Sequence, residues 1–217
     1  MSTNPTEGVN AGPFGEWLAA MRQVLRGERD ADVPCGDCIG CCVSSYPIPL
    51  RPEDVRARAE VPEQYLLGTM AAGERWMMGF REDGRCPFMI GRQCGIYAER
   101  PQTCRDYDCR IYAAAGLLPD GDRTVIEQRV REWEFSFTSD AERTDAEAVH
   151  RAAQFIRAHA TLFPAGMRAG SATAAAVLAV KVYPLFLTDQ TAEPAQLASS
   201  VMELAREFDA VKRPLVL

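Results

Sequence analysis

Residues 35–42 read Cys35-Gly36-Asp37-Cys38-Ile39-Gly40-Cys41-Cys42, so four thiols fall within eight residues. The 217-residue chain has eight cysteines, and no cysteine follows residue 109. Thiolates are preferred ligands of zinc and of iron–sulfur clusters. The sequence therefore predicts a metal-binding region, followed by a region without cysteines. All eight thiols are candidate metal ligands: the four in this stretch and Cys86, Cys94, Cys104 and Cys109.

The spacing of the first three cysteines favours an iron–sulfur cluster. Cys35, Cys38 and Cys41 form a C-x2-C-x2-C run, which can wrap a loop around one cluster while a distant residue supplies the fourth ligand, as in bacterial ferredoxins. Short C-x2-C pairs also bind zinc. A four-iron [4Fe-4S] cluster is therefore the first interpretation, and a zinc site is the alternative.

Cys42 bears on the number of sites. Neighbouring side chains diverge by about 100° on a helix and alternate on a strand, so Cys41 and Cys42 are poorly placed to chelate one ion together. Two four-thiolate sites or one bridged multinuclear centre would satisfy this limit. We expect three of the first four cysteines to join one distal cysteine, and Cys42 to join the other distal cysteines.

Arginines lie among the distal cysteines and could offset the negative charge of a thiolate site. Arg100 and Arg105, with Tyr97, are predicted to lie beside the ligands and to support the cofactor. The alternative is that the arginines are ordinary surface residues and that the tyrosine packs around the site. The arginines in this stretch are Arg85, Arg92, Arg100, Arg105 and Arg110.

Composition and targeting signals indicate a cytoplasmic protein. The net charge of −6 argues against nucleic acid as the main partner. Residues 1–11 lack the basic and apolar parts of a secretory signal. The apolar run at 172–187 is interrupted by Lys181 and Pro184, which favours a buried helix over a membrane span. A reducing compartment favours metal binding over the alternative of four disulfides in an exported protein.

The predicted fold is mainly α, with a small irregular α+β cysteine-rich region that contains one short hairpin, and with a helical bundle in the C-terminal half. We divide the chain into a disordered lead (1–12), a cysteine-cluster metal-binding domain (13–118) and a helical region packed on it (119–217). The domain should begin with an amphipathic helix over 13–25. Short helices are expected from Pro52 and from Pro62 toward Met70.

Later segments carry further local signals. Asp83-Gly84 lies between two apolar runs and predicts a hairpin of 76–80 with 86–90. A helix is expected over 101–115, ending at Gly116. Cys104 and Cys109 would be about 140° apart on it, so either the helix begins after Cys104 or the two thiols serve different sites.

The region without cysteines is predicted to be helical. Residues 124–133 have a helical pattern, whereas 133–137 alternate like a strand, and the choice stays open. A capping box at 144–147 should open a helix that ends near residue 160. Ser171 should cap the apolar helix. A last helix is marked by the spacing of Leu197, Val201, Leu204, Phe208 and Val211.

The cysteine pattern continues with Gly84-Arg85-Cys86-Pro87-Phe88 and with residues 94–109, in which Ile96-Tyr97-x-x-Arg100-Pro101-x-x-Cys104-Arg105 stands out. The whole pattern resembles the CxxCxxCC cysteine-cluster family, also called YkgJ-like, whose members are described as zinc- or iron-chelating. The resemblance covers about residues 35–110. It implies that all eight cysteines are ligand candidates, and a distant kinship to flagellin lysine N-methylases, which carry a similar cluster.

The sequence points to a metal centre more firmly than to a reaction, and it identifies no catalytic residue. Nucleotide-binding glycine loops and the G-x-S-x-G elbow are missing from it. The only histidines, His150 and His159, fall on opposite sides of one predicted helix. Three functions follow: an iron–sulfur protein for electron transfer or a redox step, a structural zinc module that binds a protein partner, and a cluster-dependent modifying enzyme such as a protein or peptide N-methylase.

Overall fold

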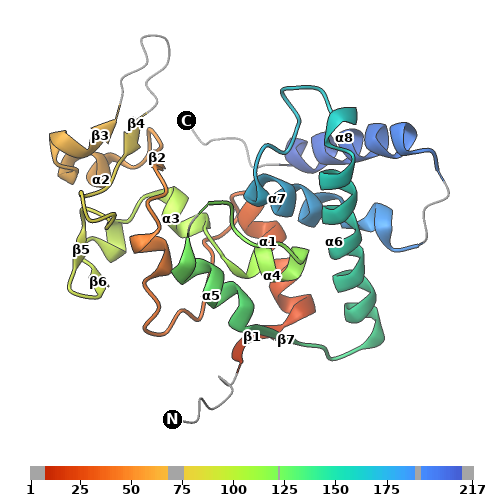
Figure 1. Cartoon of the computed structure of the whole chain (residues 1–217), viewed down its shortest axis with the longest axis horizontal. Coiled ribbons are helices and arrows are strands. Elements are labelled where there is room, and N and C mark those ends of the chain that lie inside the picture. The colour runs from red at the N-terminus through yellow and green to blue at the C-terminus, as the bar shows by residue number, and fades with distance from the viewer. Residues whose placement is uncertain (1–7, 68–75, 122, 189–191, 212–217) are drawn as a thin grey trace. The chain divides into compact units, whose positions relative to one another are not determined.

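The computed structural model describes residues 8–67, 76–121, 123–188 and 192–211. Within these ranges the fold is mainly helical with three small sheets, which confirms the predicted class (Figure 1). The chain divides into two compact units. The helical unit contains residues 1–30, 108–122 and 130–217, and the cysteine unit contains residues 31–107 and 123–129. The predicted division at residue 118 differs from these units, because 13–30 and 108–118 pack with the later helices.

A parallel strand pair lies at the start of the helical unit. Strand β1 (Val9–Pro13) pairs with β7 (Trp133–Ser136), and a bulge interrupts the register between Asn10 and Gly12. Gly12 has a φ of +87°, a conformation that glycine adopts without strain. Residues 9–12 are therefore a strand within the segment assigned to a disordered lead, while residues 1–7 lie outside the described residues. The alternating pattern at 133–137 is confirmed as a strand.

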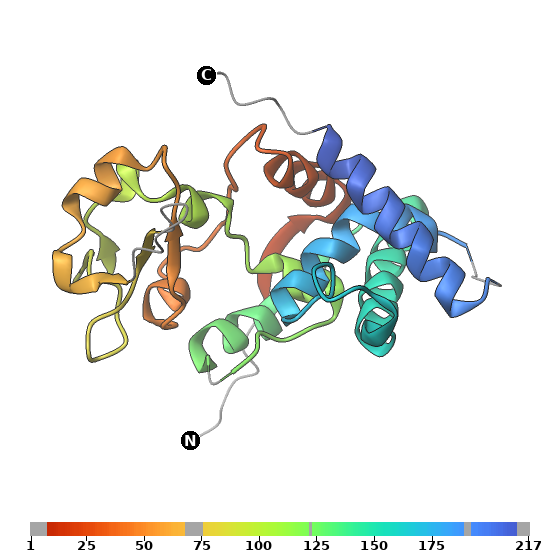
Figure 2. The same ribbon diagram turned by 90° about the horizontal axis from the view of Figure 1, so that it is seen from above.

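Helices form the core of this unit (Figures 1 and 2). Helix α6 packs on α7, α7 packs on α8, and α1 contacts both α6 and α7. Small side chains let two helices approach closely, and six alanines of α6 and α7 are fully buried: Ala148, Ala152, Ala153, Ala175, Ala176 and Ala179. The helices are α1 (Phe14–Leu25), α4 (Arg110–Ala115), α6 (Asp140–Ala158), α7 (Ala172–Val182) and α8 (Pro194–Ala210), with short turns η4 (Ala160–Leu162) and η5 (Tyr183–Phe186).

The structure confirms the predicted N-cap of one helix and corrects the predicted N-cap of another. Ser171 caps α7 as predicted, since its Oγ accepts the Ala174 N–H at 3.1 Å. Helix α6, however, begins before the predicted capping box at 144–147. Ser139 is its N-cap and accepts the Glu142 N–H at 3.3 Å, while Glu142 accepts the Thr138 N–H at 2.8 Å. The S-x-x-E signal was therefore present five residues earlier.

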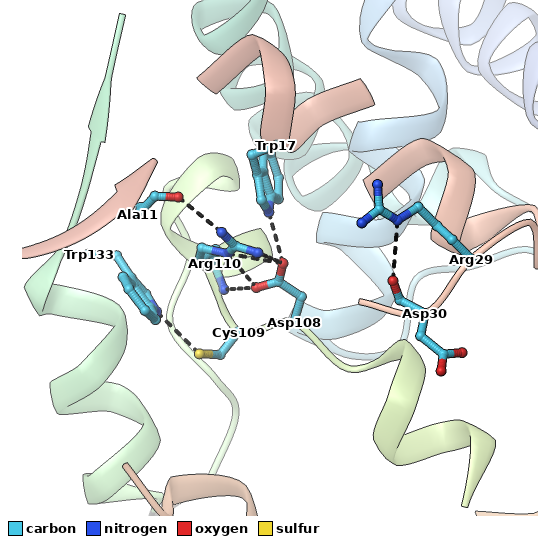
Figure 3. A network of polar contacts seen from close by, with 8 residues as sticks. All are labelled: Ala11, Trp17, Arg29, Asp30, Asp108, Cys109, Arg110 and Trp133. Carbon is cyan, nitrogen blue, oxygen red and sulfur yellow. Dashed lines mark hydrogen bonds and ion pairs between the residues drawn. The ribbon is translucent and has the colours of Figure 1, made fainter. Parts of the chain in front are cut away.

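A buried ion pair connects the first and fourth helices with β1 (Figure 3). The Arg110 Nη2 atom lies 2.7 Å from Asp108 Oδ2, and these side chains are only 10% and 3% exposed. Trp17 of α1 donates its indole N–H to the same carboxylate at 3.0 Å. Arg110 also donates to the carbonyl of Ala11 in β1 at 3.0 Å. Every charged atom of the pair is thus compensated within the unit, which a buried charge requires.

The cysteine unit has a small antiparallel sheet with strand order β2-β4-β3. These strands are β2 (Ile48–Leu50), β4 (Trp76–Met78) and β3 (Leu66–Leu67), and helix α2 (Val55–Glu60) lies between β2 and β3 in the chain. Leu50, Val61 and Met78 are its buried core, and Cys86 and Phe88 pack against it. The core is small, so cross-links between segments matter more to this unit than to the helical one.

The predicted hairpin of 76–80 with 86–90 is wrong in its strand pairing. The Asp83-Gly84 turn does form, with the Gly84 N–H donating to the Arg81 carbonyl at 2.9 Å. Yet β4 pairs with β2 and β3, whereas β5 (Met89–Ile90) pairs with β6 (Gln93–Cys94). Pro87 lacks an N–H and weakens its segment as a strand, while the apolar side chains of β4 fit the core. The short hairpin therefore lies at 89–94.

Two expected helices also change, and one open choice is answered. Residues 63–67 form a 3-10 turn, η2 (Glu63–Tyr65), followed by β3, in place of the helix expected from Pro62; the end of that prediction lies outside the described residues. The helix expected over 101–115 divides into α3 (Gln102–Asp106) and α4, because Tyr107 is extended. Gly116 ends α4 with φ +64°, as predicted. Residues 124–132 are helix α5 (Thr124–Glu132), which answers the open choice there.

No helix in the described part of the chain is both long and apolar enough to cross a membrane.

Replacing Asp108 with alanine should strongly destabilise the helical unit. Removing one partner of a buried ion pair leaves the other charge uncompensated, which costs about 3–5 kcal/mol. We expect the free energy of unfolding, measured by urea denaturation followed by circular dichroism, to fall by about that amount. The control is Glu99→Ala, which breaks the pair of Glu99 with Arg56 (41% and 73% exposed) and should cost less than about 1 kcal/mol. Equal effects of the two substitutions would contradict the expectation.

Candidate metal centre

The first two cysteines lie on a tight turn. The Cys38 N–H donates to the Cys35 carbonyl at 3.0 Å, and Gly36 has a φ of +57° in the left-handed region. The Gly40 N–H then donates to the Cys38 sulfur at 3.4 Å. This contact fixes the position of the Cys38 sulfur within the turn.

The next two cysteines lie on the 3-10 turn η1 (Gly40–Val43). The Cys86 N–H donates to the Cys42 carbonyl at 2.7 Å, so this bond joins the first cysteine run to the distal one. Gly40 is buried, and a Cβ at this position would lie 3.2 Å from Ile126 Cγ1 of α5. Glycine therefore lets α5 pack closely on the cysteine loop.

The distal cysteines of this unit are positioned by three different elements. Cys86 packs against the small core, Cys94 lies opposite Met89 in the β5–β6 pair, and Cys104 lies in α3. Helix α3 is fixed to β2 because Thr103 Oγ1 donates to the Pro49 carbonyl at 2.7 Å. Side chains far apart in the sequence are thus brought into one small unit.

Cys104 and Cys86 lie within electrostatic range of each other and of two further thiols, Cys41 and Cys94. The pKa of Cys104 is raised to about 12, mainly by burial. The neighbouring thiols of Cys41, Cys86 and Cys94 make smaller contributions to the same increase. Burial also raises the pKa of Cys86, with smaller contributions from Cys94 and Cys41. We call Cys41, Cys86, Cys94 and Cys104 the four-thiol group.

Cys41 connects this group to its neighbour in the sequence. Its thiol is hydrogen-bonded to that of Cys42, and this bond is the main reason why the pKa of Cys41 is raised. Cys41 is also an exposed residue, whereas the other three members of the group are partly buried. The group therefore lies where a surface loop meets the core of the unit.

The donor set fits a thiophilic metal. Thiols that share a partly buried place resist ionisation, and a bound cation reverses this by stabilising the thiolates. Among the described residues, no three His, Cys, Asp or Glu side chains already stand at the geometry of a single-ion site. Binding one ion would therefore draw the sulfurs closer together. None of the eight cysteines forms a disulfide.

Two arginines act on the group directly. The charge of Arg100 lowers the pKa of Cys104, and the charge of Arg81 lowers that of Cys86, each against the larger effect of burial. Arg81 donates to the carbonyls of Pro87 at 2.6 Å and Met89 at 3.1 Å, which fixes it beside the turn that carries Cys86. Sequence reasoning named Arg100 but missed Arg81, whose only signal was its place before the Asp-Gly turn.

The other two predicted supporting residues shape the loop before α3. Arg105 donates to the carbonyls of Arg100 at 3.0 Å and Ala98 at 3.0 Å. Tyr97, in the 3-10 turn η3 (Tyr97–Glu99), is 66% exposed, and its ring lies 4.2 Å from the Arg100 guanidinium carbon. These contacts hold Arg100 in place, and a role of Arg105 or Tyr97 toward a cofactor stays a prediction.

Cys109 belongs to the helical unit, unlike the other seven cysteines. It is the N-cap residue of α4, and its sulfur accepts the indole N–H of Trp133 at 3.2 Å (Figure 3). Asp108 and Arg110 on either side form the buried ion pair. The sequence offered two explanations for the spacing of Cys104 and Cys109, and in the structure Cys104 lies in α3 whereas Cys109 caps the start of α4. Whether Cys109 is a metal ligand stays a prediction.

These features define a cysteine-rich metal-binding domain. Residues 34–134 match the family model CxxCxxCC, described as "Putative zinc- or iron-chelating domain". The chain therefore carries a CxxCxxCC domain, which includes all eight cysteines and confirms the resemblance seen in the sequence. A search of curated proteins and a search of solved structures found no match.

The raised pKa of Cys104 predicts that the metal-free protein loses stability at alkaline pH. The pKa is about 12 in the folded state against an ordinary value of 9.0, so the folded state holds this proton more tightly than the unfolded state does. The stabilisation is complete below the ordinary value and is lost as the pH rises from 9.0 toward about 12. Urea denaturation of the chelator-treated, reduced chain at several pH values in this window measures the decline.

Cys104→Ser provides the comparison, because serine does not ionise in this range. The decline in unfolding free energy should be smaller in the variant than in the unmodified chain. Equal declines would show that other groups, such as the tyrosines, account for the pH dependence.

Proposed function

We propose that the four-thiol group holds an iron–sulfur cluster of the [4Fe-4S] type, and that the chain uses it to transfer single electrons. The observation that carries the proposal is that Cys104 lies within electrostatic range of Cys41, Cys86 and Cys94, and Cys86 within range of Cys94 and Cys41. They come from three separate stretches of the sequence, and four thiolates are the usual ligand set of such a cluster. The family description agrees with a zinc- or iron-chelating role.

The residues around the group suit a redox centre. When bound, the cluster supplies a reversible one-electron change at iron, and no covalent bond of the protein forms or breaks. Arg81 and Arg100 place positive charge beside the thiolates, which favours retention of an electron. Cys86 and Cys104 are partly buried, which limits the access of water to their side of the group.

The position of Cys41 supports exchange with another protein. It is exposed at the surface, so an electron would have a short path between the group and a docked partner. The partner class is a protein that donates or accepts one electron, which balances each transfer. Thiols and clusters persist in reducing compartments, and we therefore place this activity in the cytoplasm.

Zinc is the alternative occupant, because the same four thiolates would close a structural zinc site. The domain would then be a folded platform for a protein partner, without redox activity. The two functions differ in colour, in sulfide content and in response to a reductant, so one purification separates them.

Anaerobic purification after expression with iron should yield a brown protein. We expect about four iron and four sulfide per occupied cluster, a broad absorption band that bleaches on dithionite, and an electron paramagnetic resonance signal in the reduced state. Cys86→Ser combined with Cys104→Ser should abolish these signals, because it removes two of the four ligands.

Tyr97→Phe is the matched control, since it keeps the ring that lies beside Arg100 and removes no sulfur. It should retain iron, sulfide and absorption. A colourless protein that holds zinc and no sulfide would replace the redox function by the structural one. A chain that holds neither metal under anaerobic conditions would overturn both.

A further inference from the structure

We infer that Ile90, Tyr97 and Arg100 form a docking surface on the cysteine unit, and that its partner is an acidic protein that carries single electrons. We call these three residues the hairpin face. The inference rests on the proposed function for the identity of the partner, because a chain that transfers electrons must exchange them with a second molecule. Each transfer oxidises the carrier by one electron and reduces the chain by one, or the reverse.

Ile90 is the first component of this face. It ends β5, and its side chain is 72% exposed, the highest value for a large apolar side chain in the described part of the chain. The tight turn that follows is made by Gly91, whose φ is +59°. A Cβ at Gly95 would lie 2.9 Å from Ile90 Cδ1, so Ile90 lies directly over the backbone of that residue. The absence of a side chain there brings Ile90 next to the segment that carries Tyr97.

Tyr97 and Arg100 form the second component. The ring of Tyr97 belongs to a residue that is 66% exposed, and the guanidinium carbon of Arg100 lies 4.2 Å from its centre. Arg100 Nη1 also donates to the Tyr97 carbonyl at 2.8 Å, which fixes the stack. Tyrosine and arginine are enriched among the residues that contribute most to binding between proteins. Because this pair is already ordered, docking would cost little side-chain entropy.

The charge of the face indicates the kind of partner. In the described part of the chain no carboxylate pairs with Arg100, whose hydrogen bond goes to a carbonyl. The neighbouring carboxylate of Glu99 is paired with Arg56 at 2.9 Å. A positive charge beside two exposed apolar side chains is complementary to a carboxylate beside an apolar side chain. A second copy of this chain fits poorly, because a two-fold contact would bring the same positive surface together.

The size and position of the face suit a transient redox complex. Weak electron-transfer encounters have small interfaces, below about 1,200 Å² in total, so they do not need an extended apolar surface. The hairpin face also lies next to one member of the four-thiol group, since Cys94 ends β6 and immediately precedes Gly95. A carrier docked here would therefore be close to the proposed centre.

Nuclear magnetic resonance of the full chain tests the docking directly. The probe is flavodoxin, an acidic protein that carries single electrons on a flavin. The chain is purified with zinc, which is diamagnetic, and is labelled at the isoleucine δ1 methyl groups. On addition of flavodoxin the Ile90 methyl signal should shift, whereas those of the buried Ile111 and Ile156 should not. The shift should diminish as the salt concentration rises.

Substitutions at the face should weaken this binding. Ile90→Ser and Arg100→Gln should each raise the Kd for flavodoxin about 10-fold, the effect expected of a residue at the centre of a small interface. Val211→Ser is the apolar control, because Val211 is 62% exposed and lies in the helical unit. Arg206→Gln is the charge control on the exposed side of α8. Neither control should change the Kd.

The outcomes separate the docking surface from the proposed function. An unmodified chain whose Ile90 signal does not respond to flavodoxin would overturn the inference without any need for variants. An Ile90 signal that shifts with the concentration of the chain alone would assign the face to a second copy and would also overturn it. Absence of a cluster would appear in the iron and sulfide analysis and would count against the redox function, whereas docking is measured on the zinc-loaded chain.

Discussion

Burial of ionisable thiols in a small core is the constraint on which the cysteine unit depends. Burial raises the pKa of Cys104 and of Cys86, and the charges of neighbouring thiols add to this effect. A cation bound by these thiolates, as we propose, would offset that cost and would at the same time connect the segments around residues 41, 86, 94 and 104. Metal binding and folding are therefore expected to be coupled here, as in other small metal-binding domains. The small buried cluster that contains Leu50, Val61 and Met78 is a modest alternative source of stability.

The helical unit is stabilised by the packing of its core and by a compensated buried ion pair. Its core is built from fully buried alanines in α6 and α7 and from large side chains such as Phe14 and Phe163. Its buried charge is compensated in place by the Asp108–Arg110 pair and by the indole of Trp17. A metal would add little to a core of this size, whereas it can decide the fold of the smaller unit.

Local signals in the sequence were sufficient where a feature depends on a few neighbouring residues. Gly116 ends α4 and Ser171 caps α7, as their residue types predict. Features that depend on distant partners could not be read in this way. The parallel pairing of β1 with β7 joins residues more than a hundred positions apart, and the Asp83-Gly84 turn formed without its expected strand pair. Pairing is decided by which surface buries apolar side chains, which turn residues alone do not specify.

The same limit applies to the site. Thiol spacing indicated metal ligands and disfavoured a shared ion for Cys41 and Cys42, but it gave no reason to prefer one of them for the distal group. Which of the two thiols lies near the distal cysteines depends on the backbone of η1 and on the bond from the Cys86 N–H to the Cys42 carbonyl. Arg81 was missed for a related reason, since its effect on Cys86 arises from two carbonyl contacts formed only in the folded turn.

The segment from Cys104 to Cys109 shows how one short motif can serve two purposes. Cys104 is fixed by α3, which is bound to β2 through Thr103, and it belongs to the four-thiol group. The chain then turns at Tyr107, and Asp108 begins the buried network of the helical unit. A continuous helix would carry Asp108 away from Arg110, because residues two apart on a helix face different directions. The break is thus required by the ion pair, and the five-residue spacing of these cysteines reflects that break and not the geometry of a single chelating helix.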